Sequence, residues 1–432
     1  MNFYLFIFRA FLGGICVSSA LASTAWGEVS RGLGTGGEAG GGYTLSEILE
    51  LAIARNPSLA VFLANIDAVQ GDARTAAVYP NPTLYAQGGR GKPRGPDEGV
   101  ISPGTEYQAT FTQPLEWPLK RESRIKAAGA RVEVAKLDAE GFRLLLRAQV
   151  KEAFYRLMLA ERAAELAERN LATVREMRRS VEVRVRTGEA AGFELVKADV
   201  ELLKAQKDVN RARSQVDLAR AALNALLGNV LPPRFSLLGE FSSPQALPEL
   251  AVLLERALAT HPAIDRQRRE VERWRHQLSF ERQARVPDVG LGGMTMREID
   301  KDAFGMVLSV PFPIWDRRQG LIATAVAEGR RAEAELERVQ TDLTRAITQE
   351  YQNYRIAADQ FDVFKTGLLK QAEEALRIAQ ISFRQGESGL LDLLDAQRVQ
   401  RVTLQEYYAA LYDLSVAQAE LERVTGRGEL QP

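Results

Sequence analysis

The chain has 432 residues, of which 46% are hydrophobic and 26% are charged, so it can bury a large core and is not intrinsically disordered. The 56 basic residues balance the 56 acidic ones, and this neutrality gives no global field that would favour nucleic acid. One cysteine and two histidines exclude a disulfide framework and a Cys/His metal cage, so we expect no cofactor and no bound metal.

Residues 1–27 have the features of an export signal. A single charge, Arg9, precedes an apolar stretch, and small residues allow cleavage after Ala22 or after Gly27. A membrane anchor is the alternative, but serines and glycines dilute the stretch and no second apolar span follows it. Residues 28–42 are rich in glycine and are predicted to form a flexible segment.

The rest of the chain is predicted to be an internal duplication. Residues 43–228 and 249–426 contain the same succession of patterns, and a proline-containing linker, 229–248, separates them. Each copy begins with a helical pattern, continues with two strand candidates and ends with two long helical stretches. Residues 427–432 are left as a C-terminal tail.

The first helical pattern of each copy is interrupted by a polar residue followed by proline. These pairs are Asn56-Pro57 in the first copy and His261-Pro262 in the second. Because no second histidine is placed to join His261, we interpret it as a polar residue at a helix break, in preference to a metal ligand.

Two strand candidates follow in each copy, at 82–90 and 105–115 and again at 287–297 and 303–312. They are about ten residues long and alternate between apolar and polar residues. Such hairpins, 82–115 and 287–312, fit the wall of a membrane barrel and equally fit a soluble sheet.

Three methionines fall on the second hairpin. We expect Met294, Met296 and Met306 to belong to its apolar face. A soft-metal site is the alternative, but the other soft ligands that such a site needs are missing.

Very long helices follow the hairpins, over about 119–187 and about 316–385. At 1.5 Å per residue each would span on the order of 100 Å. A globular core does not cover a helix of that length, so these helices are predicted to pack against one another.

A glycine-containing turn ends each long helix. The turns are Arg186-Thr187-Gly188-Glu189 and Arg384-Gln385-Gly386-Glu387. The helix after the first turn has apolar residues spaced alternately by three and four, which is the pattern of a coiled coil. Its seam consists of Leu202, Ala205, Val209, Ala212, Val216, Ala219, Leu223 and Leu226, and the second copy keeps the register.

Four amphipathic strands cannot close a barrel, and open strand edges are not tolerated in lipid. The membrane interpretation therefore requires several copies of the chain. Three copies would supply a 12-stranded β-barrel continued by a tube of long helices. The predicted fold is mainly α with a membrane β part: a coiled-coil α-helical barrel plus four β-strands per chain.

This layout resembles the TolC-type outer-membrane efflux factors over nearly the whole mature chain. The resemblance rests on the polar-Pro helix breaks, the twin hairpins, the Gly-Glu turns and the terminal Val424-Thr425-Gly426. The segment from Val310 to Gly320, VPFPIWDRRQG, is similar to the strand-to-helix passage of the CzcC-like heavy-metal branch.

The resemblance implies a homotrimeric channel in the outer membrane with a helical tube in the periplasm. It implies docking to a periplasmic adaptor (membrane fusion) protein and an inner-membrane RND-type pump, and no enzyme activity. Heavy-metal cations such as cobalt, zinc and cadmium are the expected cargo. Drug export, protein secretion and a periplasmic coiled-coil scaffold remain alternatives, and a catalytic carboxylate pair lacks a partner motif.

Asp392 and Asp395 follow the second turn at i, i+3 on one helix face. In the family an Asp-x-x-Asp pair here lines the closed periplasmic aperture, and the resemblance implies that role. The alternative is that both acids only favour the N-terminus of a helix. The first copy has Glu194 and Lys197 at these places, and Ser388 replaces a basic gate residue of some relatives.

The resemblance also makes the two turns candidate sites for adaptor docking. They comprise Arg186, Thr187, Gly188 and Glu189 in the first copy and Arg384, Gln385, Gly386 and Glu387 in the second. A plain helix cap is the alternative interpretation, and both can hold at once.

Overall fold

The structure, a computed structural model, describes residues 42–91, 104–299 and 301–426. Several features of the sequence lie outside these residues: the predicted export signal, almost all of the glycine-rich segment, the C-terminal tail and most of the loop between the first two strands. Residues from Tyr43 onward form a unit separate from the N-terminal residues.

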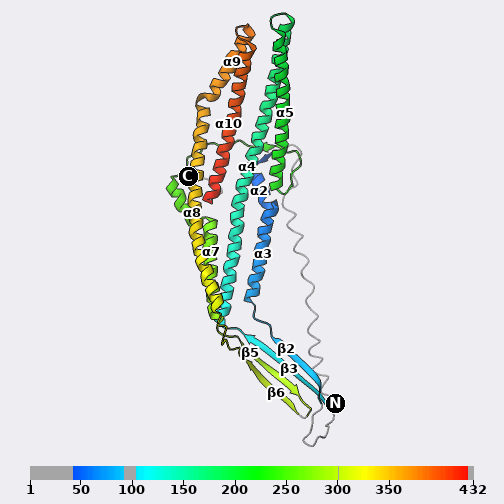
Figure 1. Ribbon diagram of the computed structural model, residues 1–432, viewed down its shortest axis with the longest axis vertical. Helices are drawn as coiled ribbons and strands as arrows, with labels where there is room; N and C mark the ends of the chain where they lie inside the picture. The colour runs from blue at the N-terminus through cyan, green and yellow to red at the C-terminus, as the bar shows by residue number, and fades with distance from the viewer. Residues whose placement is uncertain (1–41, 92–103, 300, 427–432) are drawn as a thin grey trace. The chain divides into compact units, whose positions relative to one another are not determined.

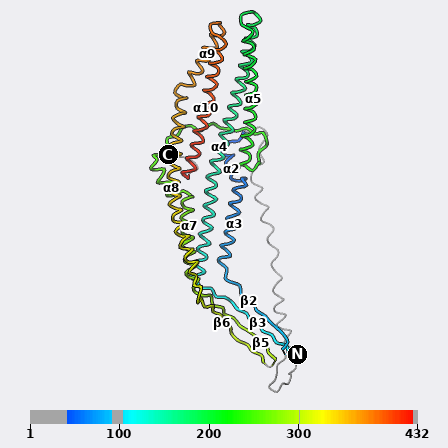
Figure 2. The backbone as a smooth tube through the Cα atoms, viewed as in Figure 1, coloured from blue at the N-terminus to red at the C-terminus, as the bar shows by residue number. Residues whose placement is uncertain are grey.

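The elements occur twice in the same order, and this order reproduces the predicted duplication (Figure 1). Figure 2 shows the first repeat from blue to green and the second from green to red. The first repeat contains α2 (Leu45–Arg55), α3 (Pro57–Ala77), β2 (Thr83–Gly91), β3 (Gly104–Leu115), α4 (Pro118–Arg186) and α5 (Gly192–Leu226). The second contains α6 (Leu250–Thr260), α7 (Pro262–Gln283), β5 (Val289–Arg297), β6 (Asp302–Ser309), α8 (Gln319–Val363), the π-helix η1 (Phe364–Leu368), α9 (Leu369–Gln385) and α10 (Leu390–Thr425).

The polar residue at each helix break is the N-cap of the following helix. The Asn56 side-chain oxygen accepts a hydrogen bond from the backbone N–H of Leu59 at 3.0 Å. His261 Nδ1 accepts one from the N–H of Ala263 at 3.1 Å. Both residues therefore satisfy an N–H that the helix leaves free, which agrees with the helix-break interpretation of His261.

Each break also contacts the end of the last helix of its own repeat. Asn56 Nδ2 donates to the carbonyl of Leu226 at 2.8 Å, and the glycine that follows α5, Gly228, lies against the Arg55 carbonyl. In the second repeat Gly426 lies against the ring of His261. The start and the end of each repeat are thereby fastened together.

His261 makes the stability of the second repeat dependent on pH. Burial holds the pKa of His261 below its usual value of 6.5, although a backbone hydrogen bond with Arg423 acts in the opposite direction. The folded state therefore binds the proton less well than the unfolded chain, so stability is complete above about pH 6.5 and falls below it.

We predict that the thermal unfolding midpoint drops by roughly a few degrees more between pH 7 and pH 5 in the wild type than in His261→Asn. Asparagine fills the same cap position without a titrating group, as Asn56 does in the first repeat. Circular dichroism melts at the two pH values provide the measurement. An equal drop of the unfolding midpoint in both proteins would show that groups other than His261 cause the pH dependence.

The long helix of the first repeat forms as predicted, since α4 is unbroken over 69 residues. In the second repeat the prediction of one helix over about 316–385 is wrong. The π-helix η1 interrupts it, and Gly367 there has φ 153°, a conformation that only glycine adopts readily. Among the described residues, no helix is both long and apolar enough to cross a bilayer.

The helices bury their predicted seams against one another. α4 packs along α5, α7 and α10, and α8 packs along α7 and α10. The alanines and aliphatic residues of the α5 seam are mostly buried, with Leu223 completely so, and Leu414 and Leu421 are equally buried in α10. The small seam residues let the helices approach closely.

The linker between the repeats contributes to the core. Leu231 and Phe235 are buried in the same cluster as Phe154. Two short strands that the sequence analysis missed, β1 (Tyr43–Thr44) and β4 (Leu237–Leu238), pair in parallel and tie the linker to the start of α2.

The four longer strands form one antiparallel sheet in the order β2-β3-β5-β6. The hairpins of the two repeats meet at β3 and β5, where Leu115 lies opposite Val289 and Tyr107 lies opposite Arg297. Within the described residues, β2 and β6 pair with no further strand and are the edges of the sheet.

The two faces of this sheet differ in polarity. We call one the apolar face: it carries Leu84, Phe111, Leu291, Phe304, Met306 and Leu308, all exposed. The other, the polar face, carries Gln87 and Gln108, whose side chains hydrogen bond to each other at 3.0 Å.

The expectation for the methionines is correct for Met306 and wrong for Met294 and Met296. In the register of the sheet Met294 lies opposite Gly305 and Met296 lies opposite Ala303, whereas Met306 lies opposite Gly293. Opposed residues share a face and successive residues alternate, so Met294 and Met296 lie on the polar face.

Candidate functional site

The two turns that the sequence singled out lie at the ends of their helix pairs that are far from the sheet (Figure 1). They have the same backbone structure. Gly188 and Gly386 are left-handed, with φ 80° and 76°. The N–H of Glu189 donates to the Arg184 carbonyl at 2.8 Å, and the N–H of Glu387 donates to the Ser382 carbonyl at 2.9 Å. These bonds are those of glycine-terminated helix caps.

The side chains of both turns are available to a partner. All eight predicted residues, Arg186, Thr187, Gly188, Glu189, Arg384, Gln385, Gly386 and Glu387, are exposed. The Thr187 hydroxyl donates to the carbonyls of Val183 and Arg184, and Arg186 forms a long ion pair with Glu182 at 3.5 Å. The helix-cap interpretation therefore describes the backbone, and the exposure of the side chains leaves them accessible to a partner.

An apolar cluster holds the two helix pairs together behind the turns. Val181 of α4 is completely buried, and Phe383 of α9 and Leu390 and Leu393 of α10 are nearly so. The guanidinium of Arg184 lies 5.0 Å from the centre of the Phe383 ring, a cation–π contact between the two pairs. The turns are thus presented on a packed support.

The two aspartates after the second turn have different partners. Asp392 accepts a hydrogen bond from the N–H of Gly389 at 3.1 Å and so caps the start of α10. Asp395 pairs with Arg398, three residues further along the helix, at 2.7 Å. Both carboxylates are exposed. The helix-terminus interpretation accounts for the contact of Asp392 and leaves Asp395 with a partner that the sequence analysis overlooked.

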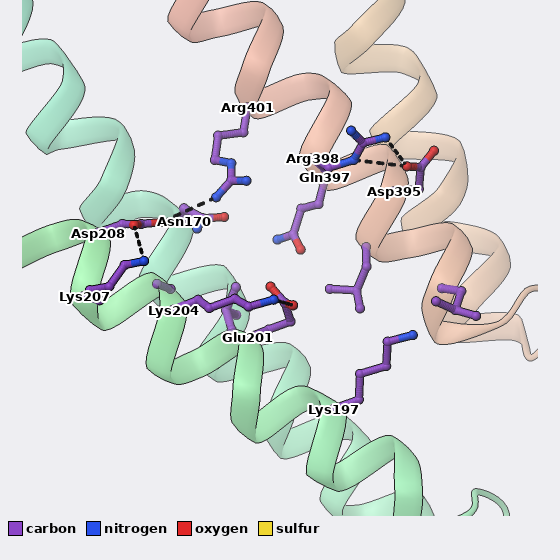
Figure 3. A pocket seen from close by; sticks show the side chains of 14 residues that line it. Asn170, Lys197, Glu201, Lys204, Lys207, Asp208, Asp395, Gln397, Arg398 and Arg401 are labelled. Atoms are coloured by element: carbon purple, nitrogen blue, oxygen red, sulfur yellow. Dashed lines mark hydrogen bonds and ion pairs between the residues drawn. The ribbon is translucent and has the colours of Figure 1, made fainter.

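A charged groove of about 460 Å³ separates α5 from α10 near these aspartates (Figure 3). Its charged lining consists of Lys197, Glu201, Lys204, Lys207, Asp208, Asp395, Arg398 and Arg401. Arg401 of α10 reaches Asp208 of α5 at 3.9 Å. Lys197 and Asp395 follow their turn glycines by the same number of residues, so the repeats place opposite charges at equivalent positions on the two walls.

Lys197 has no ion pair with another described residue, in contrast to Lys204, which pairs with Glu201 at 2.8 Å. Five cations against three carboxylates leave the groove with a net positive charge. Within the described part of the chain, no three His, Cys, Asp or Glu side chains converge as they would to hold a metal ion.

Comparison with known proteins gives a match over most of the chain. The family model "Outer membrane efflux protein" matches residues 48–229 and 253–427. The cobalt-zinc-cadmium resistance protein CzcC of Cupriavidus metallidurans is 28% identical over 392 residues, which cover 90% of this chain and 91% of that protein. The nickel-cobalt-cadmium resistance protein NccC of Alcaligenes xylosoxydans xylosoxydans is 25% identical over 77% of this chain and 73% of its own length.

Solved structures show the same fold. The outer-membrane channel OprN superposes with a TM-score of 0.75 at 20% identity, covering 89% of this chain and 90% of that chain. The Campylobacter jejuni CmeC outer membrane channel superposes with a TM-score of 0.76 at 16% identity, covering 93% and 91%. At this level of identity the likeness concerns the fold alone.

Proposed function

Because the chain belongs to the outer membrane efflux protein family, we propose that it is the channel through which heavy-metal cations such as cobalt, zinc and cadmium leave the periplasm. The family is one of channels and not of enzymes, and it sets the location in the outer membrane with a helical tube in the periplasm. The match covers both repeats, which excludes the scaffold and the carboxylate enzyme as alternatives.

The cargo is proposed from the relatives. CzcC and NccC are named for resistance to cobalt, zinc, cadmium and nickel, and CzcC aligns over nearly its whole length. This alignment over nearly the whole length of CzcC is the observation on which the proposed cargo rests. Export of drugs or of proteins through the same fold is the second candidate.

A deletion strain tests the cargo. Loss of the chain should raise cellular cobalt, zinc and cadmium, measured by mass spectrometry of washed cells, and lower the tolerated concentration of each metal. Resupply of the chain should restore both. Normal metal content with new sensitivity to organic drugs would replace the metal cargo with the drug alternative, and retention of a secreted protein would replace it with the secretion alternative.

We propose that three chains assemble into the channel after removal of residues 1–27. In this proposal 43–228 and 249–426 are its two repeats and 229–248 joins them. Support comes from the sheet, whose edges β2 and β6 have no strand partner among the described residues and whose apolar face is exposed. In lipid such edges must be paired, and three chains supply the strands of a closed 12-stranded β-barrel.

Members of this family work with an adaptor and an inner-membrane pump. We propose that this chain meets a periplasmic adaptor protein at its two exposed turns and that the pump is of the RND type. A cysteine placed at Glu189 or at Glu387 should then form a disulfide with an adaptor hairpin in cells. Cysteine at Arg169, which is also exposed and lies about 26 Å before the end of α4 at Arg186, is the matched control. Equal yields at all three sites would rule out docking at the turns.

We propose that Asp392 and Asp395 line the periplasmic aperture and attract divalent cations there. Their exposure at the first turns of α10 supports this role. The double variant Asp392→Asn, Asp395→Asn should raise single-channel conductance and weaken divalent block severalfold, most clearly at low ionic strength. Asparagine keeps the capping capacity of Asp392.

Arg398→Gln provides the opposite change. It removes the cation that pairs with Asp395 at 2.7 Å, so the carboxylate gains negative potential and divalent block should strengthen. Planar-bilayer recordings compare the three proteins. If neither the double variant nor Arg398→Gln changes conductance or block, these residues do not line the aperture.

A further inference from the structure

Two methionines of the sheet stand among polar residues. Met294 and Met296 are two residues apart on β5, and the register of the sheet places both on the polar face. Both side chains are partly buried, whereas Met306 on the apolar face is 88% exposed. Contact with lipid accounts for an exposed methionine at Met306. It does not account for Met294 and Met296, which face the other way.

On β3 the neighbours of these two methionines are polar. Met296 lies opposite Gln108, and Met294 lies opposite Thr110. The side-chain oxygen of Gln108 accepts a hydrogen bond from Gln87 at 3.0 Å, and its Nε2 donates to the Thr110 hydroxyl at 3.4 Å. A row of polar groups, tied together by these bonds, therefore runs beside the two thioethers, where a core would place apolar side chains.

On β6 the neighbours are the smallest residues. Met296 lies opposite Ala303, and Met294 lies opposite Gly305. A Cβ atom at Gly305 would stand 3.6 Å from Cγ and 3.8 Å from Cε of Met294, so the Met294 side chain lies over the glycine. Because neither neighbour has a bulky side chain, the flexible thioethers have space in which to approach each other.

The surroundings of Met296 carry a net negative charge. A hollow of about 360 Å³ has Met296, Glu106 and Glu298 in its lining. Arg297 also lines it, but its guanidinium is paired with Asp302 at 2.6 Å. The two glutamates therefore outweigh the one paired arginine, and their carboxylates raise the local concentration of cations.

Two thioethers at this spacing suit one class of ion. The sulfur of methionine is soft and uncharged, so it binds soft monovalent cations such as Cu(I) and Ag(I) in preference to Zn(II) or Co(II). Residues two apart on a strand have Cα atoms about 6.7 Å apart. Metal–sulfur bonds of about 2.3 Å require the two sulfurs to come within about 4.6 Å, which the three rotatable bonds of each side chain allow.

The two methionines lie on the expected path of a cargo. With the apolar face toward lipid, the polar face of a barrel lines its lumen. The chain runs along β5 away from α7, so Met296 lies near the end of the sheet that is far from the helices (Figure 1). An ion site in a conduit has to release its ion readily, and two neutral thioethers meet this requirement better than charged thiolates.

We propose that Met294 and Met296 together bind a soft monovalent cation, Cu(I) or Ag(I), as a low-affinity site on the lumen side of the sheet. The proposal extends the cargo of the proposed channel beyond divalent cations. It rests on the proposed function only for its place in transport, because binding of the ion is a property of the folded sheet.

Titration of the detergent-purified protein with silver nitrate in chloride-free buffer tests binding directly. The methionines carry ¹³C in their methyl groups, and Ag(I) is the probe because it keeps its oxidation state in air. We expect the methyl resonances of Met294 and Met296 to shift together. Those of Met158 and Met177, which are buried in α4, and of Met306 should stay unchanged. Zinc nitrate should shift none of the five.

Single variants decide whether the two sulfurs share one ion. Met294→Leu and Met296→Leu each remove one thioether at nearly constant volume, so the sheet should be retained. Each should weaken silver binding at the remaining methionine by about tenfold or more, because two ligands on one strand act at high effective concentration. Met306→Leu is the matched control, since it makes the same change on the apolar face, and it should leave the affinity for silver unchanged.

Three results would overturn the proposal. Methyl resonances of Met294 and Met296 that stay in place with silver would show that there is no site. An affinity at Met296 that is the same with and without Met294 would show that the two sulfurs act separately. Equal responses to silver and zinc would show that the site does not select soft cations.

The titration of the wild-type protein needs no variant, so it decides the first and third results even where a leucine variant fails to fold. The outcome is also separate from that of the proposed cobalt, zinc and cadmium export. Unchanged metal content in the deletion strain would leave the silver-induced shifts as expected, and a lack of shifts would leave that export untouched.

Discussion

Replacing Gly292 by alanine is expected to prevent the two hairpins from forming one sheet. Gly292 lies on β5 opposite Thr112 of β3. A Cβ atom at this position would stand 1.9 Å from the carbonyl oxygen of Phe111 and 2.9 Å from the Thr112 Cα. These are backbone atoms that cannot turn aside, so the β3–β5 ladder must open. We expect the free energy of unfolding to fall by about 3 kcal/mol or more, which is at the upper end of the effects of overpacking.

Gly293→Ala is the matched control for this change. Gly293 is the next residue on the same strand, and the nearest atom to a methyl group at that position would be the Gly305 carbonyl oxygen at 3.8 Å, an ordinary contact. The amount of each protein in purified outer membranes is the measurement. Gly292→Ala should be nearly absent and Gly293→Ala should be close to wild type. Equal amounts would contradict the register of β3 against β5.

Gly228→Ala is expected to loosen the first repeat where its end meets its beginning. Gly228 has φ 73°, and a Cβ atom there would lie 2.7 Å from the Arg55 carbonyl oxygen. The left-handed conformation alone costs a non-glycine residue about 1 kcal/mol. The steric overlap adds to this, and it pushes α5 away from Asn56, whose side chain donates to the Leu226 carbonyl. The total should reach about 3 kcal/mol.

Gly188→Ala separates these two contributions. Gly188 has a similar φ of 80°, but no atom lies within 4 Å of the position that a Cβ would take. Gly188→Ala should therefore lower the free energy of unfolding only by the cost of the left-handed conformation, about 1 kcal/mol. Denaturant unfolding of the purified proteins measures both. An equal fall in the free energy of unfolding of the two variants would show that the contact between Gly228 and Arg55 does not contribute to stability.

The parts of the fold that depend on residues close together along the chain were predictable from the sequence. The turn glycines Gly188 and Gly386 are left-handed as expected, because a glycine after a long helical pattern is a local signal. The seam of α5 is buried as its spacing indicates, with Ala205 and Val209 almost inaccessible. The proline-containing breaks mark real helix boundaries, since proline limits its own position and the residue before it.

The parts of the fold that depend on pairing between distant segments of the chain could not be predicted from the sequence. The periodicity of a strand shows that its residues alternate, but only the register against β3 and β6 places Met294 and Met296 on the polar face. The interruption at Gly367 was missed for a different reason, because a single glycine in a helical pattern is usually accommodated without a break. Leu231 and Phe235 lie in a stretch that reads as a linker and become core residues through contact with Phe154.

Some features of the candidate site were also predictable from the sequence, and others were not. The exposure of the two turns follows from their place at helix ends, and the Asp395–Arg398 pair was available as an i, i+3 spacing. The groove between α5 and α10 needed the packing of two helix pairs, which brings Lys197 and Asp395 to facing walls. No pattern within either helix contains that information.

Native mass spectrometry of the detergent-extracted protein tests whether three chains form the channel. Several copies of the chain are needed to pair the free edges of the sheet and to cover its apolar face. We therefore expect a particle of three chains that is stable in detergent and is lost when detergent is withdrawn. A single chain that stays folded and dispersed without detergent would contradict the proposed trimer.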